Sequence, residues 1–176
     1  MADLIAWLVL VYRVPSEPSR LRATVWRRLK AAGAVYQADS VAALPFSPAA
    51  RRSLRRLRHD VCEMGGSAQL LRAEAVAGQR HLISVVEAAR DEQYMDIEKR
   101  CHGLLTEMES AAAAGCLTHA MLRGKAAGLA KLAGQYEKVR AVDAFGASKS
   151  ELADSALARC RQALDGFAEG AISEIL

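Results

Sequence analysis

Residues 4–14 read LIAWLVLVYRV (Leu4–Val14), an almost unbroken run of aliphatic and aromatic side chains. The run has no polar face at helical spacing, so it predicts a buried strand that is covered on at least one side. It is too short to cross a bilayer, which takes about 20 residues. A signal peptide is not indicated, because Asp3 stands where a basic residue would be needed. Pro15 and Pro18 follow the run and end the strand, since proline cannot donate to the ladder.

The next sixty residues predict a helix, two short strands, a second helix and a last strand. Ser19 and Ser47–Pro48 are start signals for the two helices, and Gly33 and Gly65–Gly66 are stop signals. The expected elements are the helix 20–30, the strands 34–37 and 41–44 around a turn at 38–40, the helix 48–64 and the strand 68–72. The order β-α-β-β-α-β predicts a ferredoxin-like domain over residues 1–76, with the first strand in the middle of its sheet.

From Gln79 onward the apolar residues recur at helical spacing only. Three stripes repeat every three or four residues: Ile97, Cys101, Leu104 and Met108, then Leu129, Leu132, Tyr136 and Val139, then Leu157, Cys160, Leu164 and Phe167. Gly115 and Gly146 separate the stripes. Residues 77–176 are therefore expected to form an antiparallel bundle of three helices, and the whole chain is expected to be α+β.

The charge of the chain is unevenly distributed. The formal net charge is +4. Residues 1–73 carry 12 Lys and Arg against 5 Asp and Glu, a balance of +7, and residues 74–176 carry 12 against 15, a balance of −3. A basic first half indicates an anionic partner, such as nucleic acid, an acidic protein surface or a small oxyanion. An ordinary solvated basic face is the alternative.

A series of arginines on the second predicted helix is the most unusual local feature. Arg51, Arg55 and Arg58 share one side at helical spacing, and Arg52 and Arg56 share another. Guanidinium groups match phosphate and chromate-like oxyanions with paired hydrogen bonds, although their stems could equally cover apolar surface on a solvated helix. The candidate anion- or DNA-binding residues are Arg13, Arg20, Arg27, Arg28, Arg51, Arg52, Arg55 and Arg56.

No catalytic or metal motif is recognised. Cys116 and His119 lie one helical turn apart, but no second clean pair exists to complete a zinc site. No nucleophile elbow, HExxH, Walker A or dinucleotide-binding pattern occurs. We therefore expect no enzyme activity, no metal and no cofactor. The four cysteines are expected to be buried reduced thiols, Trp7 a core residue, and Trp26 half-exposed at an interface.

Several stretches together resemble the N-terminal region of the chromate-resistance ChrB family. They are Trp7–Pro15, Glu17–Arg20, Val25–Arg27, Gly33–Ala34, Leu44–Pro45, Ala89–Tyr94 (similar to the family's AARDEEY) and Lys138–Ala147 (similar to its KIRARDFFGA). Ala144 departs from the family pattern, which has an aromatic residue there. The first domain is also similar to the Cas2-like domain of the phenylacetate-pathway repressor family. Arg13 stands where a Cas2-like nuclease would need an acidic metal ligand, so metal-dependent cleavage is not expected.

The resemblance implies a cytoplasmic, non-enzymatic transcription regulator of bacterial chromate resistance. Its expected partners are DNA or the chromate oxyanion, and a second copy in a homodimer, with no membrane. Full-length members carry a further C-terminal domain, so one alternative is a dimerisation scaffold that works with a separately encoded partner domain and does not contact DNA. A weaker alternative is an accessory of chromate reduction, for which no glycine-rich phosphate loop is recognised.

Overall fold

The computed structural model describes residues 5–17 and 19–173, with side chains described up to residue 168. The expected strand start at Leu4 and the strand-ending Pro18 lie outside these residues. The chain is α+β, as predicted, and divides into two compact units, one up to Ala89 and one from Arg90 onward. The division falls inside a long helix.

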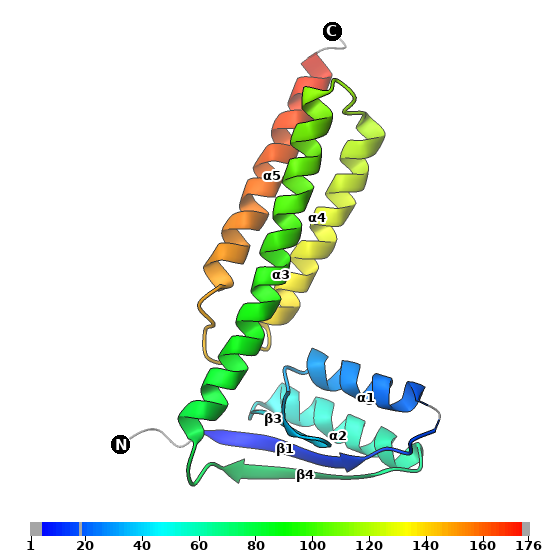
Figure 1. Ribbon diagram of the computed structural model, residues 1–176, viewed down its shortest axis with the longest axis vertical. Helices are drawn as coiled ribbons and strands as arrows, with labels where there is room; N and C mark the ends of the chain where they lie inside the picture. The colour runs from blue at the N-terminus through cyan, green and yellow to red at the C-terminus, as the bar shows by residue number, and fades with distance from the viewer. Residues whose placement is uncertain (1–4, 18, 174–176) are drawn as a thin grey trace. The chain divides into compact units, whose positions relative to one another are not determined.

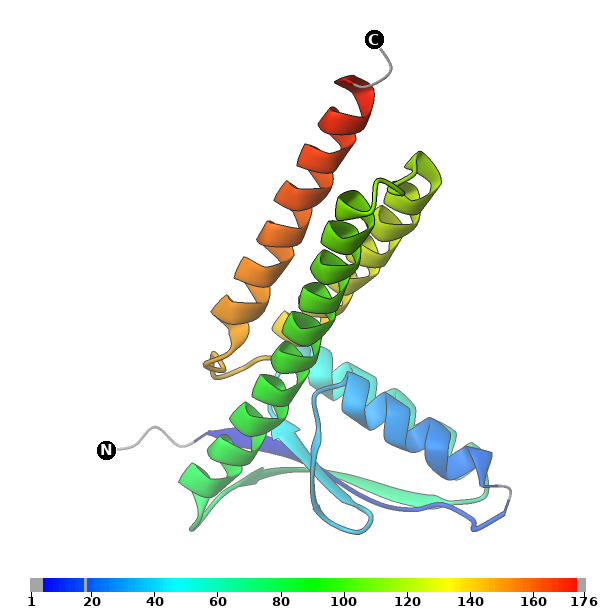
Figure 2. The same cartoon turned by 45° about the horizontal axis from the view of Figure 1, so that its top comes forward.

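The first unit contains one four-stranded antiparallel sheet and two helices on the same face of it (Figures 1 and 2). The strand order is β2-β3-β1-β4, so the apolar strand β1 lies inside the sheet between β3 and β4, as its sequence predicts. The elements are β1 (Ala6–Arg13), α1 (Arg20–Ala31), β2 (Val35–Ala38), β3 (Val41–Pro45), α2 (Pro48–Glu63) and β4 (Ser67–Glu74).

The core of the first unit lies between the sheet and the two helices. Leu8 and Leu10 of β1 project from the same face of the strand, because side chains alternate along it, and both are buried. They pack with the buried stripes of α1 and α2, Val25 and Leu29 on the first and Leu54, Leu57 and Val61 on the second. This packing fixes which face of each helix remains for solvent.

The two helix starts differ from each other. Ser47 Oγ accepts a hydrogen bond from the Ala50 amide at 3.0 Å, and Pro48 occupies the first turn, so the predicted cap of α2 is confirmed. Ser19 is the N-cap residue of α1, but its side chain makes no capping hydrogen bond, because its backbone is helical rather than extended. Ser19 therefore stands at the predicted N-cap position, but the capping hydrogen bond expected from its side chain is absent.

The second unit is helical and is built on the remainder of α3 (Gln79–Ala113), α4 (His119–Arg140) and α5 (Ser150–Ser173). The three helices lie alongside one another in Figure 1 and share one core. The core contains members of all three predicted stripes, including Ile97, Leu132 and Leu157. Thr118 caps α4 by accepting a hydrogen bond from the Met121 amide at 3.2 Å.

The cysteines correct one prediction. Cys101 and Cys160 are buried, and the Cys160 thiol donates to the Cys101 carbonyl oxygen at 3.3 Å. Cys62 and Cys116 are exposed, so the expectation of four buried thiols is wrong for these two. Within residues 5–17 and 19–173, none of the helices is long and apolar enough to cross a membrane.

Candidate functional site

The arginine series lies on the solvent side of α2. Leu54 and Leu57 of this helix are fully buried against the sheet. At roughly 100° per residue, Arg52, Arg55 and Arg56 therefore point away from the core. These three side chains and Arg51 are all exposed. The fold thus presents four of the predicted residues together as one cationic helix face.

One edge of this face adjoins α1 through an ion pair. Arg28 of α1 donates through Nη1 to Asp60 Oδ2 of α2, and both side chains are about one-third exposed, at 39% and 35%. Asp60 continues the ridge of Arg52 and Arg56 at four-residue spacing, so this ridge faces α1. Among the described residues, Arg28 is the only predicted site arginine that forms an ion pair with a carboxylate.

The other edge of the face lies beside β4 and the segment before α2. Arg58 donates through Nε to the Ala68 carbonyl oxygen of β4 at 3.2 Å. The guanidinium carbons of Arg51 and Arg72 lie 6.0 and 4.7 Å from the centre of the Phe46 ring. These cation–π contacts position the stems of the arginines without neutralising their charge.

The other two predicted arginines of α1, Arg20 and Arg27, are exposed. Arg27 lies along its own helix, donating to the Ala23 carbonyl oxygen at 3.3 Å and to Thr24 Oγ1 at 3.4 Å. Trp26 is 47% exposed, as expected, and the Lys30 ammonium lies 4.9 Å from the centre of its ring. Trp7 is 2% exposed, which confirms its predicted place in the core.

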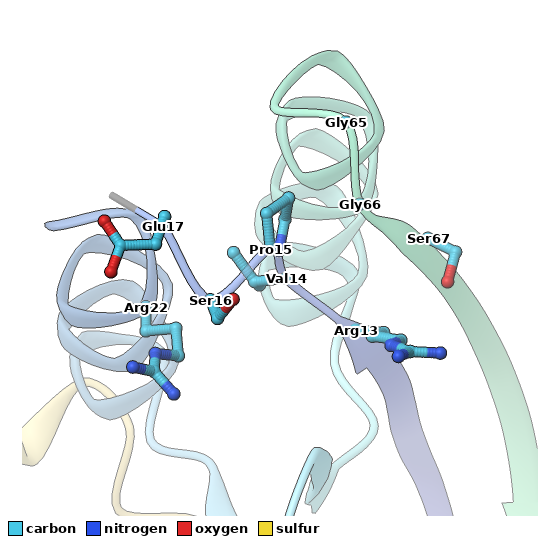
Figure 3. Close-up of a pocket in the computed structure, with 9 residues that line it drawn as sticks. All are labelled: Arg13, Val14, Pro15, Ser16, Glu17, Arg22, Gly65, Gly66 and Ser67. Carbon is cyan, nitrogen blue, oxygen red and sulfur yellow. The ribbon is translucent and has the colours of Figure 1, made fainter. Parts of the chain in front are cut away.

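A hollow of about 560 Å³ opens where β1 ends (Figure 3). Arg13 at the end of β1 and Arg22 on α1 line it, with the segment Val14–Ser16 between them. The other lining residues are Glu17, Gly65, Gly66 and Ser67.

The close approach of Gly66 to β1 shapes one wall of this hollow. A Cβ atom on Gly66 would lie 2.3 Å from the Arg13 carbonyl oxygen and 2.9 Å from that of Val61. These distances are far inside van der Waals contact, so only glycine fits without movement of the backbone. Gly66 thereby brings the start of β4 against the end of β1 and fixes the backbone of Arg13.

A second hollow of about 490 Å³ adjoins the first, because both are lined by Arg13, Val14 and Arg22. Its further lining residues are Tyr12, Trp26, Tyr36, Asp39 and Ser40. The hydroxyl oxygens of Tyr12 and Tyr36 lie 3.1 Å apart. Burial and this neighbouring hydroxyl raise the pKa of Tyr36, so its phenol stays neutral at physiological pH.

Sequence reasoning missed most of these lining residues. Arg13 was predicted on its own, and the fold places it with Arg22, which was not among the candidates. The doublet Gly65–Gly66 was interpreted only as a helix stop, although two successive glycines also indicate a close backbone approach. The sequence around Tyr36 predicts a strand and does not indicate a binding residue, because its neighbour Tyr12 is 24 residues away in the chain.

Hydrogen bonds to Asp143 hold the loop between α4 and α5 in the second unit. Asp143 accepts hydrogen bonds from the amides of Gly146 and Ala147 and from the Tyr94 hydroxyl, at 3.0 to 3.2 Å. Arg90 is 1% exposed, and burial lowers its pKa while the nearby Asp143 carboxylate opposes that shift. This arrangement balances a buried cation against a loop-anchoring carboxylate and leaves no surface for a ligand to approach Arg90.

Burial makes the thiols of Cys101 and Cys160 unreactive, because it raises their pKa. Desolvation, with Cys160 adding to it, raises the pKa of Cys101 to about 12, and desolvation raises that of Cys160. Among the described residues, no group of three or more His, Cys, Asp or Glu side chains is placed to hold a metal ion.

The match to a known protein family covers parts of both units. Residues 22–175 match the family described as Protein ChrB, N-terminal. One relative, Protein ChrB of Cupriavidus metallidurans, is 35% identical over 75 residues, which are 43% of this chain and 23% of that protein. The matched region therefore spans about a quarter of the relative's length. No solved structure matches.

Proposed function

Because this chain belongs to the ChrB N-terminal family, we propose that it is a non-enzymatic, regulator-type protein of chromate resistance that binds duplex DNA through the arginine face of α2. The face is defined by Arg51, Arg52, Arg55 and Arg56. The chromate context and the cytoplasmic setting come from the family resemblance, and the DNA contact comes from the surface itself.

The observation that carries the proposal is the exposure of these four arginines without carboxylate partners among the described residues. Like charges four residues apart on a helix, such as Arg51 with Arg55 and Arg52 with Arg56, destabilise it by a few tenths of a kcal/mol per pair. Asp60, one turn after Arg56, pairs with Arg28 of α1 and not with any of these four arginines. A polyanion such as the DNA backbone would offset the repulsion, and guanidinium groups suit its phosphates.

The architecture supports the proposal at the level of the fold. The strand order β2-β3-β1-β4, with α1 and α2 on one face, agrees with the ferredoxin-like topology that we propose for the first unit. The three helices around one core agree with the proposed helical bundle of the second. In this arrangement α2 presents its outer side to a large partner without disturbing the sheet.

The test is a salt titration of DNA binding with the purified chain. Fluorescence anisotropy of a labelled duplex from the region upstream of its own gene, between about 50 and 200 mM salt, should give affinity that falls steeply with salt. The variant with Arg51, Arg52, Arg55 and Arg56 all changed to Ala should flatten the slope of log K against log salt by roughly 3 to 4, if each arginine contacts one phosphate.

A matched control changes four exposed cations of the second unit, Arg123, Lys138, Arg159 and Arg161, to Ala. It alters the net charge equally and should leave most of the binding intact. Loss of binding to the same extent in both variants would mean that total charge, not the α2 face, attracts DNA. Failure of the wild-type chain to bind duplex at low salt, with a stable dimer by light scattering, would favour the scaffold function instead.

A further inference from the structure

The two adjoining hollows at the end of β1 combine three kinds of groups that one inorganic anion would not use together. Both are lined by two arginines, Arg13 and Arg22. They also contain two carboxylates, Glu17 in the first and Asp39 in the second, and a set of aromatic rings in the second. A ligand that contacts all three kinds of groups would carry negative charge for the arginines, a hydrogen-bond donor for the carboxylates and a planar ring for the aromatic side chains.

The size of the hollows also argues against a small oxyanion. At about 560 and 490 Å³, each is larger than one tetrahedral oxyanion would fill. A tetrahedral oxyanion is bound tightly only when several donors converge on it at hydrogen-bond distance. Figure 3 shows Arg13 and Arg22 on the two sides of the segment Val14–Ser16, so their guanidinium groups do not converge on one point.

The aromatic part of the second hollow is placed for stacking. Trp26 lies one helical turn after Arg22 on α1, so the two side chains share a ridge. The indole is 47% exposed, and Tyr36 is 37% exposed. Exposed rings beside guanidinium groups are the arrangement with which proteins hold unpaired bases, because every base has a face that stacks.

We propose that these hollows bind one unpaired nucleotide of a nucleic-acid strand, with its two flanking phosphates at Arg13 and Arg22 and its base against Trp26 and Tyr36. The Asp39 carboxylate then accepts a hydrogen bond from the base or the sugar. This proposal deepens the proposed function and rests on it, because it adds a strand end or an unpaired base to the duplex that α2 contacts.

The test uses the trinucleotide (dT)₃, which is too short to form a duplex. Trp7 is buried and Trp26 is exposed, so quenching of tryptophan fluorescence by (dT)₃ reports mainly on Trp26. We expect saturable quenching with the wild-type chain. Calorimetry with (dT)₃ should give an affinity that falls about 5- to 100-fold in Trp26→Ala, that Trp26→Phe largely restores, and that also falls in Arg22→Ala. Arg123→Ala, an exposed arginine of the second unit, is the matched control and should bind as the wild type does.

Sodium sulfate serves as the probe for a small tetrahedral dianion. Sulfate that binds saturably and displaces (dT)₃ would overturn the nucleotide proposal in favour of an oxyanion site. Absence of any (dT)₃ binding by a chain that still binds duplex DNA would overturn it too, while leaving the function of α2 intact. Conversely, the variant with the four α2 arginines changed to Ala should lose duplex binding and keep its affinity for (dT)₃, so the two proposals fail separately.

Discussion

In the first unit, α2 exposes four arginines that form no ion pair with a described carboxylate, whereas in the second unit several charged side chains bond to a neighbouring element. Lys125 of α4 pairs with Glu107 of α3, and Arg100 Nη1 donates to Gln135 Oε1 at 2.7 Å. Asp91 accepts a hydrogen bond from the Lys149 amide at 2.7 Å. Charges that are satisfied internally stabilise a fold, and charges left open are available to a partner.

The largest expected effect tests whether the two units are stabilised independently, by weakening the core of one unit at a time. Leu54→Ala removes a fully buried side chain of the first unit, and Leu157→Ala removes one of the second. Each should lower the free energy of unfolding of its own unit by about 2–5 kcal/mol, because the cavity cannot collapse completely. Trp7 and Trp26, the two tryptophans of the chain, both lie in the first unit, so tryptophan fluorescence during urea unfolding follows that unit.

Leu54→Ala should therefore shift the fluorescence midpoint, and Leu157→Ala should mainly shift the helical circular dichroism signal. Equal shifts of both signals by both variants would indicate that the units unfold in one step. The comparison would then describe two surfaces of a single cooperative structure, not two units with separate tasks.

The next largest effect tests the wall of the hollow beside Arg13. In Gly66→Ala the new Cβ would meet backbone oxygens of Arg13 and Val61, so β1 or α2 must move, at a cost of about 1–3 kcal/mol. Gly65→Ala meets no atom closer than 3.9 Å, but its φ of +79° is strained for alanine by about 1–2 kcal/mol. Only Gly66→Ala should also weaken (dT)₃ binding, because it alone displaces the backbone of Arg13.

Urea unfolding and calorimetry check these two variants. Gly103→Ala on α3 is the control, since its Cβ would meet open space in the middle of a helix. It should stabilise the second unit by roughly 0.5–1 kcal/mol. If Gly66→Ala is as well tolerated as Gly103→Ala, the close approach at β1 has no energetic importance.

These positions also mark how far the sequence predicts the molecule. The helices, the strands and the Ser47 cap follow from local patterns, because each depends on neighbours within a few residues. The central place of β1 follows from the order of the elements and from the apolar run of that strand. The pairing of Arg28 with Asp60 does not, since the two lie 32 residues apart on different helices. The hollows depend on Gly66 meeting Arg13 and on Tyr36 meeting Tyr12, contacts that only the packed sheet creates.

Alkaline pH should affect the second unit through its buried thiols. The pKa of Cys101 is about 12 in the folded chain against an ordinary value of 9.0, and that of Cys160 is also raised. A folded pKa above the unfolded value stabilises the fold below the unfolded pKa, and this stability is lost as pH rises through the folded pKa. The free energy of unfolding should thus fall between pH 9 and 12, by on the order of 1 kcal/mol per pH unit through Cys101, and Cys160 acts in the same direction.

Urea unfolding followed by circular dichroism at pH 8, 9 and 10 measures this slope. Cys101→Ala should reduce the slope between pH 9 and 10, before the phenol of Tyr94, with its own pKa raised to about 12, contributes from pH 10 upward. An unchanged slope in Cys101→Ala would mean that another group causes the alkaline loss.

The smallest expected effect tests the one carboxylate on the edge of the arginine face. Asp60→Asn releases Arg28 and removes a negative charge beside Arg56, so duplex DNA should bind more tightly, with a salt slope steeper by up to about 1. Stability should change by less than about 1 kcal/mol, because the pair is partly exposed to solvent. Asp96→Asn is the matched control: it breaks the exposed pair with Arg100 in the second unit and changes the net charge equally. DNA anisotropy should separate the two, since only Asp60 lies beside the proposed contact surface. If both variants tighten binding to the same degree, DNA responds to the charge of the whole chain. The contrast between the unpaired arginines of α2 and the bonded charges of the second unit then has no functional meaning.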